Sequence, residues 1–405
     1  MDSKIMADFP LVELHRHLDG NVRIETILDI AQSHGLETPA KTIEGLRPFV
    51  QVTEPKPSIL DFFKKFEWLT KILVDYDTCR RVAYENIEDA CEEGIDYIEL
   101  RFSPWFMAEK NNLDPQGVVE AVIDGIRIGK KDFGIKANII GIISRTYGPD
   151  ICMQEFEALI SCKDDICALD LAGDEINFPG SLFVEHFKKA RNVGWLACPH
   201  AGEAEGPHAI WQAIQELGAV RIGHAVSAIR DEELLDFLAE QQIGIESNLT
   251  SNVQTTTVSD YEHHPLKTFL EKGIRACINT DDPGISAITL PDEYNIAAIK
   301  AGLSDEQIQQ SQRNALALAF LSDQEKNELI TQKKIMNNPN QTQAMITLYK
   351  NTYFSKSNIP LWKALRDLNI STHSHLAIRD GVLITDDEIL HPSETIELIA
   401  VVSGG

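Results

Sequence analysis

Residues 13–20, ELHRHLDG, place two histidines, His15 and His17, one residue apart at the end of an apolar run. In a β-strand, residues i and i+2 point to the same face, so both imidazoles can reach one point in space. On an α-helix they would lie about 200° apart around the axis and could not meet. An isolated pair at this spacing is most often an ordinary feature of a strand edge, so the other polar residues of the chain must decide its meaning.

The bulk composition restricts the class of protein. The chain has 405 residues, 43% of them hydrophobic, which suffices for one large core and a small second domain. It has no apolar run of about 18 residues and no secretory signal pattern at its start, so we expect no membrane span. The net charge of −25 argues against nucleic-acid binding. Seven scattered cysteines without a C-x-x-C pair indicate reduced thiols and a cytoplasmic location.

Short apolar runs alternate with segments of helical periodicity, such as 118–132 and 232–242. The eight candidate strands are 11–17, 96–103, 136–144, 166–173, 195–202, 219–225, 243–248 and 274–282. Eight strands that alternate with helices predict an α/β protein with a (β/α)8 TIM barrel. An open doubly wound sheet is the alternative, but no G-x-G-x-x-G follows the first strand.

Two further segments stand outside this alternation. Residues 58–73 predict an extra amphipathic helix, in which Phe63, Phe66 and Trp68 are expected in the core, with the wall of a pocket as the alternative. After a helix at 322–334 comes the polar stretch MNNPNQTQ (336–343), which is typical of a linker. We therefore expect a first domain over residues 1–335 and a second domain over residues 344–405. The expected elements of the second are strands at 345–350, 375–380 and 395–402 and a helix at 360–368.

Polar residues end four of the eight predicted strands. They are His15 and His17 on the first, His200 and Glu203 on the fifth, His224 on the sixth, and Asp281 and Asp282 on the eighth. In a TIM barrel the carboxyl ends of the strands form one rim, where active sites are built, so these residues should converge. Imidazole nitrogens and a carboxylate oxygen are good ligands for Zn²⁺.

The chemistry of a zinc site then suggests individual roles. His15, His17, His200 and Asp281 would hold one zinc ion, which lowers the pKa of water to about 7. His224 would steer the resulting hydroxide and Glu203 would donate a proton. Asp282, adjacent to Asp281 and facing the other way, would be free for the substrate. The other interpretation of Asp282 is a helix N-cap before Pro283.

Seven motifs, in order along residues 8–330, resemble the motif series of the adenosine deaminase family. They are ELHRHLDG, LRFSP (100–104), LDLAGDE (169–175), HAGE (200–203), RIGH (221–224), ESNLTSN (246–252) and NTDDP (279–283). The resemblance implies a zinc-dependent (β/α)8 barrel of the amidohydrolase kind. It also implies hydrolytic deamination of adenosine and 2′-deoxyadenosine to inosine and 2′-deoxyinosine, with release of ammonia.

The resemblance also implies roles for particular residues. The expected metal ligands are His15, His17, His200 and Asp281; the expected catalytic residues are Glu203, His224 and Asp281; the expected substrate-binding residues are His17, Asp19, Gly173 and Asp282. In this scheme Glu203 donates to purine N1 and His224 orients the water. Asp282 binds N7, the backbone of Gly173 binds N3, and Asp19 binds the ribose 5′-hydroxyl.

Some positions bear on substrate choice. Adenine deaminases of the same superfamily tend to carry HLEG where this chain has HLDG, so Asp19 favours the nucleoside over the free base. Pro199, Ala225 and Asn248 stand where the family usually has an aliphatic residue, glycine and cysteine. The alternatives are deamination of adenine or another purine-like amine, and a carrier or interaction protein whose barrel is secondary.

The segment RDGVLITDDEILHPSETIELIAVVSGG (379–405) resembles the C-terminal half of the β-grasp sulfur-carrier proteins of thiamine and molybdopterin synthesis. The resemblance implies a ubiquitin-like domain over 344–405 whose terminal Gly404-Gly405 is activated by an adenylating enzyme of the ubiquitin-activating type. Glycines without side chains can enter a narrow channel, which suits such a reaction. The alternative is a polar tail on a docking domain. Beside this partner we expect a small nucleoside substrate, no nucleic acid and no membrane.

Overall fold

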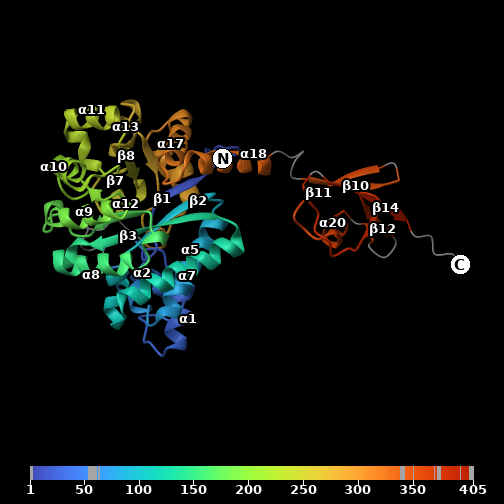
Figure 1. Ribbon diagram of the computed structural model, residues 1–405, viewed down its shortest axis with the longest axis horizontal. Helices are drawn as coiled ribbons and strands as arrows, with labels where there is room; N and C mark the ends of the chain where they lie inside the picture. Colours follow the sequence, from blue (N-terminus) through green and yellow to red (C-terminus); the bar gives the residue numbers. More distant parts are fainter. Residues whose placement is uncertain are drawn as a thin grey trace. The chain divides into compact units, whose positions relative to one another are not determined.

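The computed structural model describes residues 3–52, 62, 64–337, 343–349, 351–368, 370–371, 375–392 and 394–400. Its contacts divide the chain into two compact units (Figure 1). The first comprises Met1–Met6 and Pro10–Ser322, and the second Ala7–Phe9 and Asp323–Gly405. The division thus falls at Ser322, before the boundary at residue 335 that the sequence suggested. No helix in the described part of the chain is long and apolar enough to cross a membrane.

The first unit is built on parallel strands that match the eight predicted runs. Their bounds are β1 (Val12–His17), β2 (Tyr97–Phe102), β3 (Lys136–Ser144), β4 (Ala168–Ala172), β5 (Leu196–Ala197), β6 (His200–Ala201), β7 (Arg221–His224), β8 (Gly244–Ser247) and β9 (Ala276–Ile278). One sheet has the order β1-β2-β3-β4-β5 and the other β6-β7-β8-β9. The fifth predicted strand is divided into β5 and β6 at Pro199, which has no N–H to donate to a ladder.

The first strand of one sheet, β1, is hydrogen-bonded to the segment that follows the last strand of the other sheet, β9. Arg16 of β1 forms a parallel bridge with Asp281, just beyond β9. The His17 amide donates to the Asp281 carbonyl over 2.8 Å, and the Asp281 amide donates to the His15 carbonyl over 2.9 Å. This join makes the unit TIM-barrel-like and disfavours the open sheet, and the predicted α/β class is confirmed.

Helices lie around the outside of these strands (Figure 1). They are α1 (Ile24–Ser33), α2 (Ile43–Val50), α4 (Phe66–Lys71), α5 (Tyr76–Glu92), α6 (Pro104–Ala108), α7 (Pro115–Phe133), α8 (Gly148–Ile160), α9 (Val184–Asn192), α10 (Pro207–Gln212), α11 (Glu232–Gln241), α12 (Leu249–Gln254), α13 (Leu266–Glu271), α14 (Pro283–Ser286), α15 (Leu290–Asp292), α16 (Ala298–Lys300) and α17 (Asp305–Leu318). Helix α7 shows why such a segment is helical. Asp114 accepts from the Gln116 amide as N-cap, Pro115 occupies the first turn, and Gly134 ends the helix with φ 71°.

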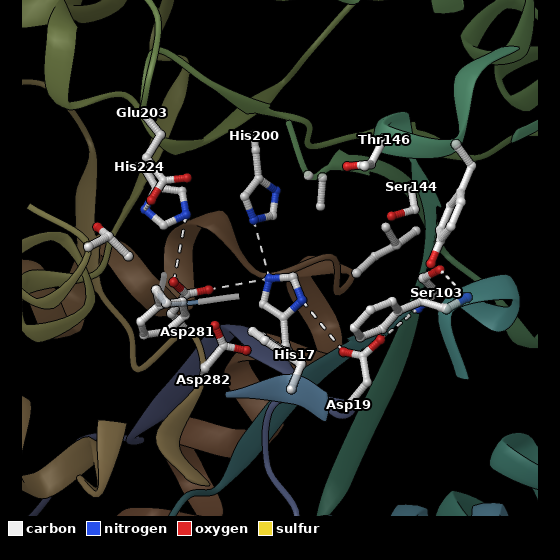
Figure 2. A pocket seen from close by; sticks show the side chains of 18 residues that line it. His17, Asp19, Ser103, Ser144, Thr146, His200, Glu203, His224, Asp281 and Asp282 are labelled. Carbon is white, nitrogen blue, oxygen red and sulfur yellow. Dashed lines mark hydrogen bonds and ion pairs between the residues drawn. The ribbon is translucent and has the colours of Figure 1, made fainter. Parts of the chain in front are cut away.

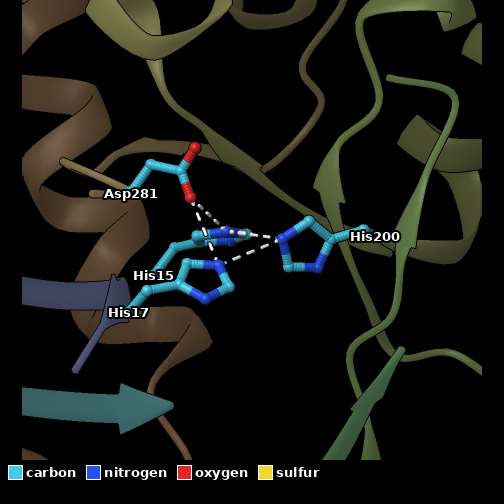
Figure 3. A group of neighbouring side chains, drawn as sticks. All are labelled: His15, His17, His200 and Asp281. Carbon is cyan, nitrogen blue, oxygen red and sulfur yellow. Dashed lines mark hydrogen bonds and ion pairs between the residues drawn. The ribbon is translucent and has the colours of Figure 1, made fainter. Parts of the chain in front are cut away.

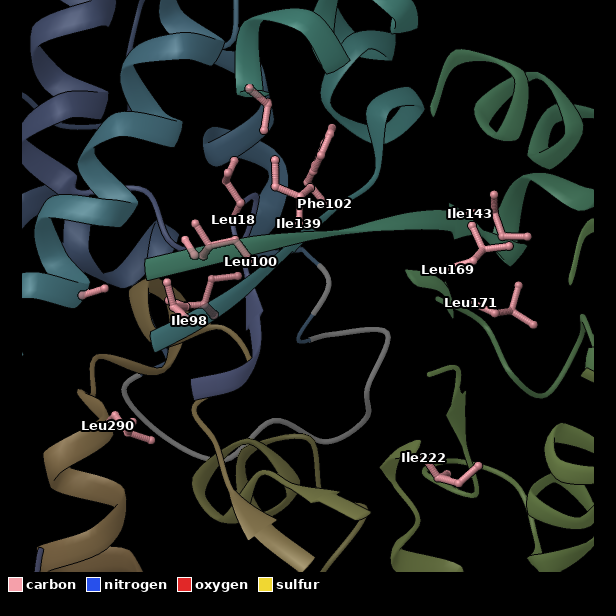
Figure 4. Close-up of a cluster of buried hydrophobic side chains, with 14 of the residues drawn as sticks. Leu18, Ile98, Leu100, Phe102, Ile139, Ile143, Leu169, Leu171, Ile222 and Leu290 are labelled. Carbon is pink, nitrogen blue, oxygen red and sulfur yellow. The ribbon is translucent and has the colours of Figure 1, made fainter. Parts of the chain in front are cut away.

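The apolar faces of strands and helices form one large core. On β2 and β3, Ile98, Leu100 and Ile139 project into it beside one another (Figure 4). On α7, Val118, Val122 and other residues at helical spacing are buried. Burial of a Val, Leu or Ile side chain contributes about 1.5–3 kcal/mol, so this core holds the strand ends at a fixed geometry.

The predicted helix at 58–73 is seen only in part, because residues 53–61 and Phe63 lie outside the described residues. Helix α4 includes Phe66 and Trp68, and Trp68 is buried as expected. Phe66 packs against the core and also lines a cavity together with Phe62, so it fits both interpretations. An amphipathic pattern marks an apolar face but does not tell whether a core or a cavity lies beneath it.

The second unit contains helix α18 (Asp323–Asn337) and a mixed sheet of order β11-β10-β14-β12-β13. The strands are β10 (Gln343–Leu348), β11 (Asn351–Lys356), β12 (His375–Arg379), β13 (Val382–Ile384) and β14 (Thr395–Ala400), and helix α20 spans Leu361–Asp367. β10 and β14 are parallel and the other pairs antiparallel. Ile346, Leu361, Leu365, Ile396 and Leu398 are among its core residues. Most of the predicted linker and the terminal Ser403–Gly405 lie outside the described residues.

Candidate active site

Four side chains at the strand ends surround one point (Figure 3). The Nε2 atom of His200 lies 3.2 Å from Nε2 of His15 and 3.2 Å from Nε2 of His17. Oδ1 of Asp281 lies 3.2 Å from Nε2 of His15 and 3.3 Å from Nε2 of His17. A tetrahedral zinc ion with ligands at about 2.0–2.1 Å has ligand atoms about 3.3 Å apart, so the four residues fit such an ion.

The far nitrogens of two of these imidazoles are bound to buried carboxylates. Nδ1 of His15 lies 2.6 Å from Glu246, and Nδ1 of His200 lies 2.9 Å from Asp170. A carboxylate only accepts hydrogen bonds, so each ring carries its proton on Nδ1. The Nε2 lone pairs are thereby left free for a metal, as is usual for histidine ligands.

Two buried arginines hold these carboxylates in turn. Arg101 donates to Asp170 over 2.9 Å and to Glu246 over 2.7 Å. Arg221 donates to Glu246 over 2.6 Å and to Glu99 over 2.5 Å. Burial would raise the pKa of Glu246, but Arg101 and Arg221 hold it well below its usual range. Burial would likewise raise the pKa of Asp170, but His200 and Arg101 hold it well below its usual range, so both carboxylates that support the histidines are charged.

Four functional residues were not predicted from the sequence: Arg101, Asp170, Arg221 and Glu246. A signal was present, because each is a charged residue within a strand that is buried along most of its length, and each lies inside one of the quoted motifs. A charged side chain is rarely fully buried unless it is paired. Their pairing partners lie on different strands, which the spacing along the chain does not reveal.

A cavity of about 260 Å³ opens beside the four residues (Figure 2). The side next to the four-residue group is lined by His17, His200, Glu203, His224, Asp281 and Asp282. The other side is lined by Gly173 and by polar residues that include Asp19, Ser103, Ser144 and Thr146. Phe62, Phe66, Phe106, Ile142 and Tyr147 form much of the apolar wall. A mostly apolar pocket with a few convergent polar groups is the usual form of a small-molecule site.

Glu203 is held at the metal side with a side chain that is 12% exposed. Its Oε1 atom lies 3.7 Å from Nδ1 of His224. Burial, together with the charges of Asp281 and Glu175, raises the pKa of Glu203 to about 8. At neutral pH this side chain therefore carries a proton that it can donate.

His224 is oriented by two asparagines of the neighbouring helix start. Nδ2 of Asn252 lies 2.9 Å from Nδ1 of His224, and Nδ2 of Asn248 lies 3.3 Å from the same atom. Because an amide NH₂ donates, Nδ1 is the acceptor and the ring proton is on Nε2. Nε2 lies 3.8 Å from Oδ2 of Asp281, so that N–H points toward the four-residue group.

The two other unusual positions have visible consequences. Ala225 has φ 50°, in the left-handed region that glycine adopts without steric cost. Pro199 lies in the break between β5 and β6, where its carbonyl accepts from Gly223. The following residue, His200, instead donates its amide to the Asp170 side chain over 3.2 Å. The proline thus leaves this histidine in place beside the other three residues.

Asp281 and Asp282 diverge from neighbouring positions. Oδ2 of Asp281 accepts from Ser251 over 2.6 Å, while Oδ1 faces the histidines. Oδ1 of Asp282 is buried without a hydrogen-bond partner among the described residues, and the side chain makes no capping bond to α14. Asp282 thus occupies the N-cap position of α14, as the alternative interpretation proposed, but its carboxylate is not used to cap the helix. Burial and the charge of Asp281 raise its pKa well above the usual range.

Two glycines make room for these groups. A Cβ at Gly20 would lie 1.7 Å from Oδ1 of Asp282, and a Cβ at Gly173 would lie 2.5 Å from Oγ1 of Thr146. Gly173 also has a φ angle of 107°, a backbone conformation that residues with a Cβ atom rarely adopt. Both positions require glycine, and Gly173 exposes its backbone to the cavity.

Asp19 lies across the cavity from Glu203 (Figure 2). Its Oδ2 accepts from the Ser103 amide over 3.2 Å, and its Oδ1 lies 3.8 Å from Nδ1 of His17, too far for a hydrogen bond. One oxygen of Asp19 is therefore available to a ligand. Taken with His15, all nine residues singled out from the sequence border this cavity or the four-residue group beside it.

Comparison with known proteins agrees with the quoted motifs. Residues 10–335 match the family described as adenosine deaminase. The adenosine deaminases of Aliivibrio fischeri (strain MJ11) and Escherichia coli O1:K1 / APEC are each 58% identical over 325 residues, 80% of this chain and 98% of the relative.

Solved structures show the same architecture. An adenine deaminase from Arthrobacter aurescens has a TM-score of 0.75 at 23% identity and covers 80% of this chain and 98% of its own. The N6-methyl-AMP deaminase of Arabidopsis thaliana has a TM-score of 0.70 at 26% identity and covers 82% and 98%. By its family match and its identity to these bacterial relatives, the chain belongs to the adenosine deaminase family.

Proposed function

We propose that this chain deaminates adenosine and 2′-deoxyadenosine by hydrolysis, with inosine or 2′-deoxyinosine and ammonia as products. The observation that carries the proposal is the juxtaposition of His15, His17, His200 and Asp281 with the protonated Glu203 at one end of a single cavity. The activity for which the bacterial relatives are named supports it. An enzyme of this kind belongs to purine salvage.

We assign the metal as one Zn²⁺ per chain, because three imidazoles and one carboxylate at tetrahedral spacing suit that ion. When bound, zinc supplies a Lewis acid that makes water a nucleophile at neutral pH. The chain's own residues do the remaining work. His224, with its proton on Nε2, orients the attacking water. Glu203 donates its proton to purine N1 as water adds to C6.

In the second half of the reaction, a proton is moved to the leaving 6-amino group. The proton of the new C6 hydroxyl passes to the 6-amino group, the C6–N6 bond breaks, and ammonia leaves, while the other proton of the consumed water restores the acid form of Glu203. The carboxylate of Glu203 can relay the hydroxyl proton, since it lost its own to N1 in the first half. Each turnover consumes one water molecule and leaves the purine with a carbonyl at C6.

Three contacts would hold the substrate in place. Asp282 is protonated in this scheme, and the O–H of its unpartnered oxygen donates a hydrogen bond to purine N7. The backbone amide of Gly173 binds N3, and Asp19 accepts from the ribose 5′-hydroxyl on the far side of the cavity. Because Asp19 addresses the sugar, a nucleoside is a better substrate than adenine in this scheme.

Glu203→Gln should retain zinc and lose most of the deamination rate. Glutamine preserves the shape but has no acidic proton, and general acid–base groups typically contribute about 10²–10⁴-fold. The measurement is kcat for adenosine beside the zinc content of both proteins. Turnover near the wild-type value at equal zinc content would contradict the role of Glu203 while leaving the family assignment intact.

Asp19→Ala should weaken kcat/KM for adenosine and leave 5′-deoxyadenosine nearly unaffected. A hydrogen bond to a charged partner contributes about 1.5–3 kcal/mol, so the loss should be about 10–100-fold. Comparing the two substrates on both proteins isolates the 5′-hydroxyl. Equal losses for both would show that Asp19 is needed only for its bond to the Ser103 amide.

We also propose that residues 1–335 form the deaminase and that 344–405 form a β-grasp domain related to sulfur carriers. In chain order the sheet β11-β10-β14-β12-β13 runs second, first, fifth, third, fourth, and α20 packs its Leu361 and Leu365 into the core. This order suits a β-grasp domain. Its partner would be an adenylating enzyme that activates the Gly405 carboxylate. The seven unpaired cysteines suit the cytoplasmic location expected from the sequence.

If the tail is a carrier, the intact mass of protein from cells supplied with sulfur should include a species about 16 mass units heavier, the change from carboxylate to thiocarboxylate. Deleting Gly405 should abolish that species and leave adenosine deamination unchanged. Absence of the heavier species, and of any adenylate with the host's activating enzymes and ATP, would reduce this region to a docking domain. A chain ending at residue 340 should still deaminate adenosine.

A further inference from the structure

Glu175 is a buried carboxylate that the mechanism above does not use. It is only 5% exposed. Its two oxygens accept four consecutive backbone N–H groups: Gly202 over 2.6 Å, Glu203 over 3.1 Å, Ala204 over 2.8 Å and Glu205 over 3.0 Å. Four donors from one loop on one side chain make a closed clamp rather than a chance contact.

The clamp joins two parts of the cavity wall. Glu175 follows Gly173 by two residues in the turn after β4, and the clamped residues 202–205 follow β6. One of the four clamped amides is that of Glu203 itself, the residue that donates to N1 in the proposed reaction. The groups assigned to N3 and N1 of the purine are therefore tied to each other through a single side chain.

Two hydrogen bonds from Arg145 join the strands from which these two loops emerge, β4 and β6. Nη2 of Arg145 donates to the Leu171 carbonyl over 3.0 Å and to the His200 carbonyl over 2.7 Å. The end of β4 and the start of β6 are thus already joined below the loop. Because the strands have their own tie, Glu175 is needed for the loop above them and not for the barrel.

We propose that Glu175 is a positioning residue for the deamination: it fixes the backbone at Glu203 so that the proton donor stands at the correct distance from the purine held at Gly173. The inference rests on the proposed function, since it deepens the role of Glu203. Enzymes lose activity steeply when a reacting group shifts by about 1 Å, and a loop held by four charge-assisted bonds has little room to shift.

The charge of Glu175 acts in the same direction as its geometry. It adds to burial and to the charge of Asp281 in raising the pKa of Glu203 to about 8. A neutral side chain at position 175 would loosen the loop and remove part of this support. Both changes lower the fraction of molecules in which Glu203 carries its proton at the right place.

The test is a double-mutant cycle of Glu175→Gln with Glu203→Gln in the zinc-loaded, full-length protein. The glutamine NH₂ turns a donor toward backbone donors, so the clamp opens at nearly constant volume. We expect kcat for adenosine to fall about 10–100-fold in E175Q, with KM and zinc content changed less than about threefold. In the E203Q background the same substitution should cost less than about threefold, because the residue it positions is already disabled.

Asp231→Asn is the matched control. Asp231 also accepts a backbone N–H, that of Leu234 at the start of α11, and borders no part of the cavity. It should lose a similar bond without the change in kcat. If E175Q does not fold, Glu175→Asp takes its place in the cycle. Aspartate keeps the charge but has a shorter side chain, so kcat should fall, but by less than the roughly 10–100-fold expected for an open clamp.

The outcomes separate the two proposals. Independent, multiplying losses in the cycle, or a loss confined to KM or to zinc content, would overturn the positioning role while leaving the deaminase proposal standing. Wild-type protein without adenosine deamination would instead remove the proposed function itself. A kcat loss that disappears in the E203Q background establishes that Glu175 acts through Glu203.

Discussion

Arg101 lies buried between Asp170 and Glu246, the two carboxylates that hold the far nitrogens of His200 and His15. The rest of the site depends on this charge balance. Removal of one partner from a buried ion pair typically costs about 3–5 kcal/mol, because it leaves an uncompensated charge, whereas exposed pairs contribute about 0–1 kcal/mol. The charged groups inside the barrel therefore act as a single unit, with Arg101 at its centre.

From this unit the site can be followed outward. The carboxylates set the tautomers of His15 and His200, the free Nε2 atoms and Asp281 then surround one point, and the apolar core keeps the strand ends from moving apart. The loops above add the groups that act on substrate in the proposed reaction: Glu203 within the clamp of Glu175, and Asp19 across the cavity. In the proposed reaction, substrate binding, proton donation and metal ligation thus come from different layers of one rim.

Much of this arrangement could be predicted because it follows from periodicity. Alternation placed His15 and His17 on one face of a strand, and parallel strands bring their carboxyl ends to one rim. Contacts between loops could not be predicted, since nothing in the spacing of Glu175 and Glu203 shows that one clamps the other. The sequence left two places open for Phe66, the core and a pocket wall, because an apolar helix face looks the same above either. Strand β11 was not predicted, because its residues are exposed and polar at most positions and so lack the alternation that reveals a buried face.

The central claim is that the four-residue group holds a zinc ion required for hydrolysis of adenosine. The most direct measurement removes metal by chelation and follows the conversion of adenosine to inosine as zinc is returned in known amounts. The account predicts no turnover in the metal-free protein and a linear recovery that ends at about one zinc per chain. Full activity without metal would contradict the claim. Equal recovery in variants that lack the side chains of His15, His17, His200 or Asp281 would contradict it as well.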